Sequence, residues 1–222
     1  MERQGPLDTS KNREKYRIWL TKEKEARYLS HHDIAQILEQ SIRRANLDVC
    51  MAGHYNPRLK ISFFSSVPVG VSSEGEPIEI SFGRPISEIE IFETLQKKLP
   101  SHLNLRKVEK VSDPAPKNLK ISYVLTLSSP ISPQKVDDLI QQKTIVVTRH
   151  KKKQTIEIDI RPYILDCRLE NFQEVARIYF TILMTPKGSA SPWELLSLLG
   201  IAADDTNSIS ITRDSVQFLS SG

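Results

Sequence analysis

The apolar residues of this chain change their spacing in a fixed order along the sequence. Alternating apolar residues or runs of strand-forming residues, both typical of strands, occur at 16–20, 59–64, 77–82 and 103–111. Apolar residues at helical spacing lie between these strands, at 34–45 and 86–99. The resulting order is strand, helix, strand, strand, helix, strand, which is the split βαβ arrangement of ferredoxin-like folds.

The second half of the chain repeats this order. Strands are predicted at 119–127, 144–148, 155–160, 174–184 and 209–212. One helix begins at Ser132-Pro133 and a second at Ser191-Pro192, because proline suits the first turn of a helix. The strand predicted at 163–169 is interpreted as an insertion, and 144–160 as a hairpin of the module. We therefore predict an α+β protein with two tandem ferredoxin-like (βαββαβ) modules, each with an antiparallel sheet.

The boundary between the two modules is predicted from prolines. Asp113-Pro-Ala-Pro116 contains two prolines in four residues, which indicates a linker at 113–117. The modules then cover 15–112 and 118–222. The polar residues 1–14 are predicted to be a disordered leader.

Charge and hydropathy limit the compartment and the partners. Lys and Arg number 31 against 27 Asp and Glu, which gives a net charge of +4, and each half of the chain carries +2. This balance permits an acidic partner such as RNA without requiring one. No apolar run reaches the roughly 18 residues of a membrane-spanning helix, and the N-terminus lacks the apolar stretch of a signal peptide. We expect a cytoplasmic protein with no membrane contact.

The cysteine count limits the cofactors. Cys50 and Cys167 are the only two cysteines, and we interpret both as free thiols. Two cysteines cannot supply the three or four thiolates that hold an iron–sulfur cluster. We therefore expect no iron–sulfur cluster in this chain. His31, His32, Asp33 and His54 are residue types that could bind a metal, but the expectation is neither a metal nor a cofactor in this chain.

A cluster of polar residues precedes and follows the first predicted helix. His31 and His54 are candidate general acid–base residues. Ser30 and Asp33 have an alternative role, because a serine followed three residues later by a carboxylate resembles a capping box. The candidate binding residues are Ser30, His31, Asp33, Arg43, Arg44, Tyr55, Asn56, Arg58, Lys60 and Glu76.

Basic residues suggest contact with phosphate. Arg58 and Lys60 lie beside Tyr55 and Phe63, a combination that fits backbone contact together with base stacking. Arg43 and Arg44 could instead compensate the helix dipole. A second basic group on the closing strand of the first module contains Arg106, Lys107 and Lys110.

Two features of the second module could also bind anions. Lys151, Lys152 and Lys153 lie at the predicted hairpin tip and are candidate phosphate contacts, although a solvated turn is the alternative. Backbone amides of the segment 185–192 precede a helix and could bind an anion. The common signatures of nucleotide-binding loops, metalloproteases and serine hydrolases do not occur in the sequence.

Several segments in register resemble one family, the bacterial radical-SAM-linked proteins. They are Tyr28-Leu-Ser-His-His-Asp33, Ser41-Ile-Arg-Arg-Ala45, Tyr55-Asn-Pro-Arg-Leu-Lys-Ile-Ser-Phe63 and Pro68-Val-Gly-Val-Ser-Ser-Glu-Gly-Glu76. The resemblance covers 16–111 and departs from the family at His32, His54, Leu59 and Ser191. It continues more weakly at Gly188–Pro192 and Ile211–Arg213.

The resemblance implies a partner. Members of the family have no known function, occur alone or fused to radical S-adenosylmethionine domains, and are often encoded beside RNase E/G-type ribonucleases. It therefore implies that an iron–sulfur cluster and S-adenosylmethionine belong to a partner chain. The same tandem architecture resembles CRISPR repeat-processing endoribonucleases at the level of fold alone.

Three functions follow as hypotheses. The first is an accessory protein that binds RNA, or presents a partner, with a radical-SAM enzyme or a ribonuclease in RNA modification or processing. The second is a metal-independent endoribonuclease in which His31 or His54 transfers protons and Lys60 or Arg58 stabilises charge. The third is a protein-interaction scaffold without nucleic acid. The first is favoured, because the polar cluster is basic and is not arranged as a catalytic triad.

Overall fold

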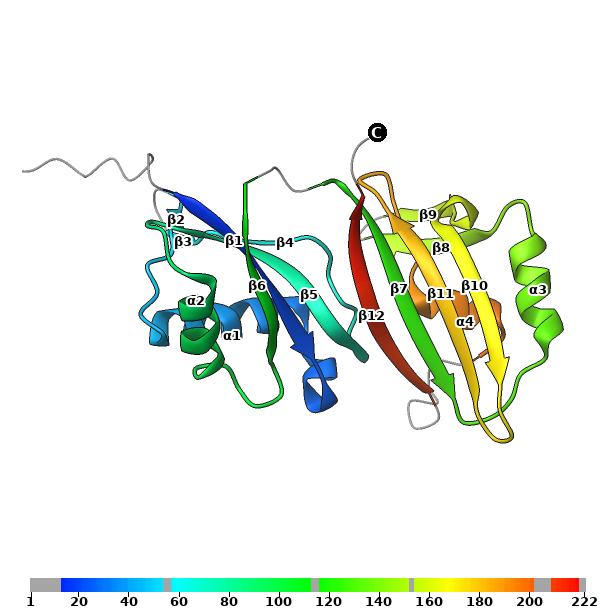
Figure 1. The fold of residues 1–222 in the computed structure, drawn as a ribbon. Coiled ribbons are helices and arrows are strands. Elements are labelled where there is room, and N and C mark those ends of the chain that lie inside the picture. The colour runs from blue at the N-terminus through cyan, green and yellow to red at the C-terminus, as the bar shows by residue number, and fades with distance from the viewer. Residues whose placement is uncertain (1–12, 54–56, 113–115, 152–153, 202–208, 220–222) are drawn as a thin grey trace, which may run out of the picture. The chain divides into compact units, whose positions relative to one another are not determined.

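The structure is a computed structural model that describes residues 13–53, 57–112, 116–151, 154–201 and 209–219. Within these ranges the chain is a mixed α+β protein with antiparallel sheets and four α-helices (Figure 1). It divides into two compact units, Met1–Pro114 and Ala115–Gly222, which are described separately.

The first unit contains one four-stranded sheet and one small hairpin. Its elements are β1 (Glu14–Lys22), the 3-10 helix η1 (Lys24–Tyr28), α1 (His31–Arg44), β2 (Met51–Ala52), β3 (Arg58–Leu59), β4 (Ile61–Phe63), β5 (Val71–Phe82), α2 (Glu88–Gln96) and β6 (Leu105–Val111). The strand order of the sheet is β4–β5–β1–β6, and every neighbouring pair is antiparallel. Strands β2 and β3 pair only with each other.

Both helices of the first unit contribute apolar side chains to one core. Ile34, Leu38 and Ile42 on α1 are buried, as are Ile91 and Leu95 on α2. They join one core with alternate residues of β1 and β5. The predicted helical spacing of the apolar residues in the segment 34–45 is therefore confirmed.

Strand β5 is longer than the segment 77–82 predicted from its alternation. It begins at Val71, and Ser73 is already in register with Lys22 of β1. The segment 72–75, which lies before the predicted strand at 77–82, therefore belongs to β5. Gly75 lies against Trp19 of β1, and a Cβ there would be 3.6 Å from the indole ring, which is an ordinary contact distance.

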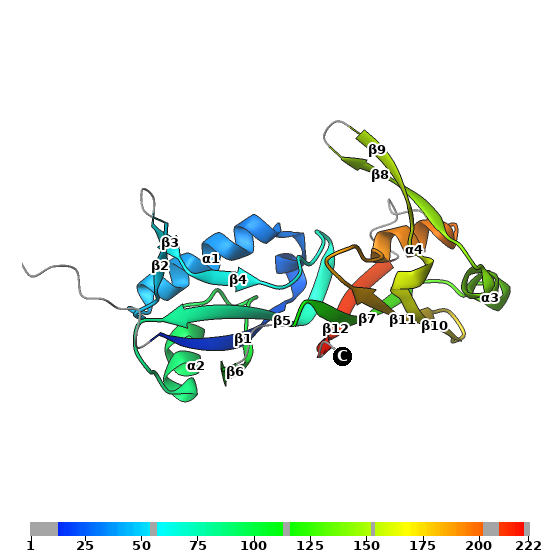
Figure 2. The same ribbon diagram turned by 90° about the horizontal axis from the view of Figure 1, so that it is seen from above.

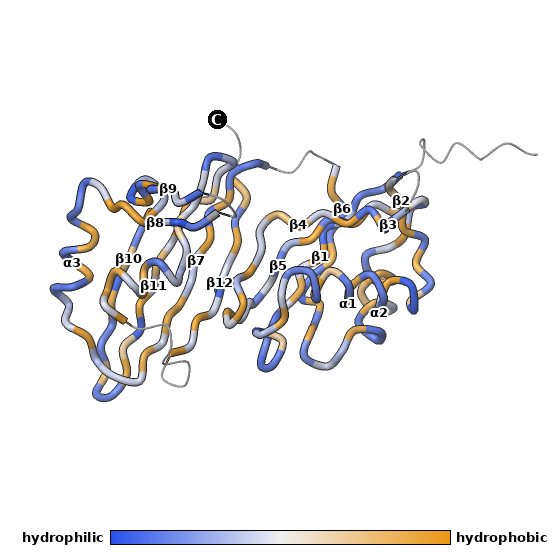
Figure 3. The backbone as a smooth tube through the Cα atoms, turned by 180° about the vertical axis from the view of Figure 1, so that it is seen from behind, coloured by the Kyte–Doolittle hydropathy of each residue, from blue (hydrophilic) through white to orange (hydrophobic). Residues whose placement is uncertain are grey.

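The second unit also has a four-stranded sheet and a separate hairpin. Its elements are β7 (Asn118–Leu127), α3 (Pro133–Gln141), β8 (Val146–Lys151), β9 (Gln154–Asp159), the 3-10 helix η2 (Arg161–Tyr163), β10 (Ile164–Asn171), β11 (Ala176–Met184), α4 (Pro192–Leu198) and β12 (Ile209–Leu219). The strand order of the sheet within the unit is β10–β11–β7–β12. Strands β7 and β11 alternate between buried and more exposed residues, and Figure 3 shows the apolar stretches of these strands in orange.

The insertion in the second unit is not the predicted one. The strand at 163–169 was interpreted as inserted, but β10 pairs with β11 and belongs to the sheet. Strands β8 and β9 pair only with each other and extend away from the sheet as a separate hairpin (Figure 2). Both segments have strand-like alternation, so periodicity alone could not decide which of them joins the sheet.

Arg161 fixes the chain between the hairpin and the sheet. Its guanidinium donates to the carbonyl oxygens of Ile140 and Gln142, at 3.1 and 3.0 Å, and to that of Ile164 at 3.0 Å. These bonds supply partners for carbonyls at the end of α3. They also link this helix end to the first residue of β10.

Strand β12 continues beyond the predicted end at Thr212. The register with β7 shifts between Arg213 and Ser215, which is the signature of a β-bulge at Asp214. Pairing then resumes and reaches Leu219. The alternation of apolar residues stops at Arg213 and Asp214, which had indicated the end of the strand. In the structure these two consecutive residues lie at the bulge instead.

No helix among the described residues is both long enough and apolar enough to span a membrane.

Candidate functional site

Ser30 and Asp33 form the start of α1. The Ser30 hydroxyl accepts from the Asp33 amide at 3.2 Å, and the Asp33 carboxylate accepts from the Ser30 amide at 2.8 Å and the Ser30 hydroxyl at 2.7 Å. This is a complete capping box, as the spacing of the two residues indicated. The hydrogen bonds from Ser30, first the hydroxyl and then the amide, lower the pKa of the Asp33 carboxyl.

We expect Ser30→Ala to destabilise the first unit by about 1 kcal/mol, because the variant loses the cap. Because folding lowers the pKa of Asp33, its carboxylate adds to the free energy of unfolding at a pH above its ordinary pKa of 3.8. This contribution is lost as the pH falls through the lowered pKa of the folded state. Urea unfolding at neutral and acidic pH measures both effects. Ser132→Ala is the control, because Ser132 begins α3 without a side-chain cap bond. An equal loss in the two variants would contradict this role of Ser30.

His31 connects α1 to the edge strand of the first sheet. Its ring packs edge-on against Phe63 of β4, with 4.5 Å between the ring centroids and 75° between the planes. Phe63 is itself packed against the core of the unit. The exposed residue His31 is therefore held against a side chain that packs on the core.

The two arginines at the end of α1 have different partners. Arg44 donates to the Lys98 carbonyl oxygen at 2.9 Å and to the Ser41 hydroxyl at 3.1 Å, which connects the ends of α1 and α2. Arg43 forms an ion pair with Glu39 at 2.8 Å, one turn earlier on the same helix.

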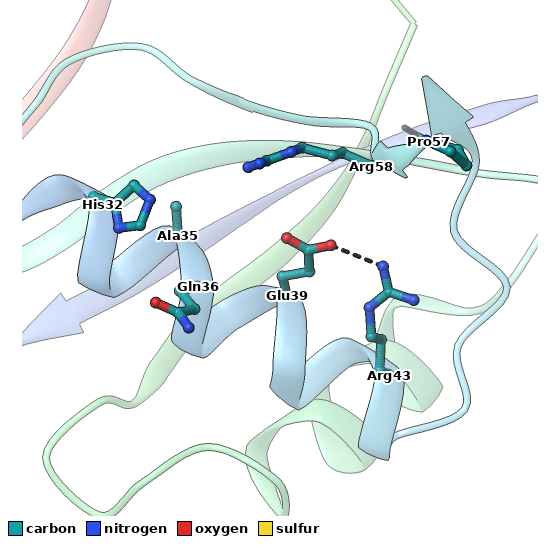
Figure 4. A pocket seen from close by; sticks show the side chains of 7 residues that line it. All are labelled: His32, Ala35, Gln36, Glu39, Arg43, Pro57 and Arg58. Atoms are coloured by element: carbon teal, nitrogen blue, oxygen red, sulfur yellow. Dashed lines mark hydrogen bonds and ion pairs between the residues drawn. The ribbon is translucent and has the colours of Figure 1, made fainter. Parts of the chain in front are cut away.

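A pocket of about 390 Å³ lies between the polar side of α1 and the hairpin β2–β3. Its lining consists of His32, Ala35, Gln36, Glu39, Arg43, Pro57 and Arg58 (Figure 4). The Arg58 side chain points from β3 toward the part of α1 that carries Ala35 and His32 (Figure 4). Arg58 has no hydrogen bond or ion pair with any residue that the structure describes, whereas Arg43 is paired with Glu39.

The pocket contains only part of the predicted binding set. Arg43 and Arg58 line it, while Ser30, His31, Asp33, Arg44, Lys60 and Glu76 do not. Lys60 is exposed on the chain between β3 and β4, and Glu76 is 4% exposed on β5, opposite Leu20. His54, Tyr55 and Asn56 lie outside the described residues.

The basic run of the second unit is partly structural. Arg149 on β8 donates to both carboxylate oxygens of Glu194, at 2.6 and 2.9 Å, and to the Ser189 carbonyl oxygen at 2.6 Å. The Glu194 carboxylate raises the pKa of Arg149. Lys152 and Lys153 lie outside the described residues, and the side chain of Lys151, the last residue of β8, does as well.

The start of α4 already holds a carboxylate. Glu194 accepts from the Ser191 amide at 2.9 Å, and Ser191 in turn caps the helix. The backbone amides of the segment 185–192 were considered above as a site for a bound anion. The Glu194 carboxylate already occupies the start of the helix, where such an anion would bind. Glu194 also anchors the hairpin β8–β9 through Arg149.

The basic residues of β6 form ion pairs, and the thiol of Cys167 is buried. Arg106 pairs with Glu74, Lys107 with Glu109, and Lys110 with Glu14 at 2.9 Å. Burial raises the pKa of the Cys167 thiol to about 11, so it is protonated at neutral pH. Among the described residues, no group of three or more histidines, cysteines and carboxylates could hold a metal ion.

The pocket is suited to binding an anion. Arg58, His32 and Gln36 have side-chain donors with no hydrogen bond to any described residue, and the pocket carboxylate, Glu39, is paired with Arg43. The helical spacing of the apolar residues at 34–45 puts Gln36 and Glu39 on the opposite, polar side of the helix, and neither was among the candidate binding residues. One feature of the sequence could have indicated the pocket. Ala35 is a small residue on the polar side of the helix, and it leaves space between its longer neighbours.

Comparison with known proteins gives a family and several distant structural likenesses, of which two are described here. Residues 15–192 match the family DUF2344, described as an uncharacterized protein conserved in bacteria. No curated protein matches the chain. A chain in the crystal structure of a Cbf5-Nop10-Gar1 complex is 9% identical, with a TM-score of 0.47 over 90% of this chain and 48% of that one. This chain therefore spans about half the length of that relative.

The second likeness is to an unknown protein from Galdieria sulphuraria. It is 9% identical, and the match covers 94% of this chain and all of that one, with a TM-score of 0.28. Neither score is high enough to carry an argument about fold or function.

Proposed function

The chain belongs to DUF2344, a family of uncharacterized proteins conserved in bacteria, and we propose that it acts there as an accessory RNA-binding protein. Its expected partner is a radical-SAM enzyme or an RNase E/G-type ribonuclease, in RNA modification or processing in the cytoplasm. The pocket on α1 carries the RNA-binding part of this proposal. The resemblance to radical-SAM-linked proteins supports the partner, which would hold the iron–sulfur cluster and S-adenosylmethionine.

We also propose that the two units are tandem ferredoxin-like modules. Strand order supports this, because β4–β5–β1–β6 and β10–β11–β7–β12 both place the first strand of the unit between the third and the last. In each unit one helix follows the first sheet strand and another follows the third. This is the connectivity of the split βαβ arrangement.

The electrostatics of the pocket favour a phosphate over a neutral ligand. An arginine without an acidic partner offers several donors to phosphate oxygens in a fixed geometry. In the pocket Arg58 has this property, and the Arg43 charge is compensated by Glu39. RNA supplies a phosphate at each nucleotide, so a single exposed arginine can contribute directly to affinity.

We expect the purified chain to bind single-stranded RNA at low salt, with Arg58→Gln weakening binding about tenfold. The logarithm of the affinity should fall with the logarithm of salt concentration, and loss of one phosphate contact should reduce this slope by about 0.7. Anisotropy of a labelled uridine dodecamer, measured over a salt series, gives both values.

Arg84→Gln is the matched control for this experiment. Arg84 is an exposed arginine of the same unit, pairs with Glu90 at 3.6 Å and does not line the pocket. It should change neither affinity nor slope. The proposal fails if the wild-type chain binds no RNA at low salt, or if the two arginine variants behave alike.

The other hypotheses have separate outcomes in the same preparation. If the wild-type chain cleaves the dodecamer and a His31→Ala, His54→Ala double variant does not, the protein is an endoribonuclease and the accessory role is wrong. Co-elution with a purified radical-SAM enzyme in the absence of RNA binding would favour a scaffold.

A further inference from the structure

The free positive charge of the pocket is concentrated at one point. Arg58 reaches from β3 over the helix toward His32 (Figure 4), and both side chains line the pocket. Arg43, further along α1, is compensated by the Glu39 carboxylate at 2.8 Å. Among the described lining residues, Arg58 is therefore the one cation without an acidic partner, and His32, which interacts electrostatically with the Asp33 carboxylate, supplies further donors beside it.

Ala35 makes this point accessible. It lines the pocket on α1 between His32 and Glu39, on the side of the helix toward which Arg58 points (Figure 4). Its single methyl group leaves open the space that a longer side chain would fill. The pocket volume of about 390 Å³ is near the lower end of the roughly 300–1,000 Å³ found for small-molecule sites.

We propose that this pocket binds the terminal nucleotide of an RNA strand, with its phosphate monoester between Arg58 and His32. The inference rests on the proposed RNA-binding function and names the part of the RNA that the site selects. Gln36, one turn from His32 on α1, can donate to and accept from the sugar or base of the same nucleotide.

A terminal phosphate fits the site better than an internal one. A groove that follows a strand presents cations along its length, because every nucleotide carries a phosphate. In this pocket the donors of Arg58 and His32 lie at one end, and the next charged groups along α1 are the ion pair of Arg43 and Glu39. A phosphate monoester carries about −1.5 to −2 charges near neutral pH, whereas an internal phosphodiester carries one, so concentrated donors favour the monoester.

The test compares uridine hexamers that differ only at their ends. One carries a 5′-phosphate, one a 3′-phosphate and one has hydroxyl groups at both ends, and calorimetric titration of the full chain measures each affinity at low salt. We expect one phosphorylated hexamer to bind about tenfold more tightly than the hydroxyl-ended one. Which hexamer it is identifies the strand end that the pocket binds.

Ala35→Leu locates the effect in the pocket. Leucine is a good helix former, so the variant should fold while its side chain fills the phosphate position. The preference for a phosphorylated end should disappear, with a loss of about tenfold in affinity for the preferred hexamer. Gln40→Leu is the matched control, because Gln40 is exposed on the same helix and does not line the pocket.

The outcomes separate this inference from the function on which it rests. Equal binding of all three hexamers, or an end preference that survives Ala35→Leu, would overturn the terminal site and leave the RNA-binding function intact. Failure of every hexamer and of the dodecamer to bind would overturn the RNA-binding function and the terminal site together.

Discussion

Phe180→Ala should destabilise the second unit by about 3–5 kcal/mol. Phe180 is 1% exposed at the centre of β11, and its ring stacks on Tyr123 of β7 with 5.0 Å between centroids. The substitution removes the transfer free energy of the ring and leaves a cavity between two neighbouring strands. Domains are typically stable by about 5–15 kcal/mol, so this loss is a large fraction of the total.

The two tryptophans allow each unit to be followed separately. The chain has two, Trp19 on β1 and Trp193 on α4. In a Trp19→Phe background, urea unfolding monitored by fluorescence reports on the second unit through Trp193. Phe172→Ala is the control, since Phe172 is 51% exposed and its loss should cost at most about 1 kcal/mol. Similar losses in the two variants would contradict the position of Phe180 in the core.

Leu38→Ala should destabilise the first unit by about 2–5 kcal/mol. Leu38 is 0% exposed, in the middle of α1 and between two other buried residues of that helix, Ile34 and Ile42. The cavity would lie beneath the helix that carries Gln36 and Glu39 of the pocket. We therefore expect RNA binding to be lost together with the fold of this unit as urea is raised.

A Trp193→Phe background reports this transition through Trp19. Ile89→Ala on α2 is the control, because Ile89 is 71% exposed in the same unit. Its effect should stay within about 0.5 kcal/mol. If both variants unfold at the same urea concentration, Leu38 does not contribute as proposed.

Local signals in the sequence predicted α1 well. Ser30 and Asp33 specify its start, and Ile34, Leu38 and Ile42 specify its buried side, because capping and periodicity depend only on neighbouring residues. The strands of the second unit depended on distant contacts. Arg149 bonds the hairpin β8–β9 to α4, and Arg161 bonds the first residue of β10 to the end of α3, and none of these contacts can be read from the alternation of nearby residues.

The candidate site was only partly predictable for a similar reason. Arg58 was identified from its chemistry and its neighbourhood, and it lines the pocket. Gln36 and Glu39 belong to the pocket only because the hairpin β2–β3 lies over this side of α1. The polar side of a helix has the same sequence pattern whether solvent or a ligand covers it.

The strand order within each unit has a consequence for synthesis on the ribosome. Arg17 and Glu109, on β1 and β6, are 92 residues apart, and Tyr123 and Arg213, on β7 and β12, are 90 apart. Because the ribosome adds about 5–20 residues per second, β6 is translated roughly 5 to 20 s after its neighbour β1. Such non-local pairing also slows folding itself to about milliseconds to seconds. Each unit therefore spends seconds as a nascent chain with an incomplete sheet, and this interval is when chaperone contact or misfolding would occur.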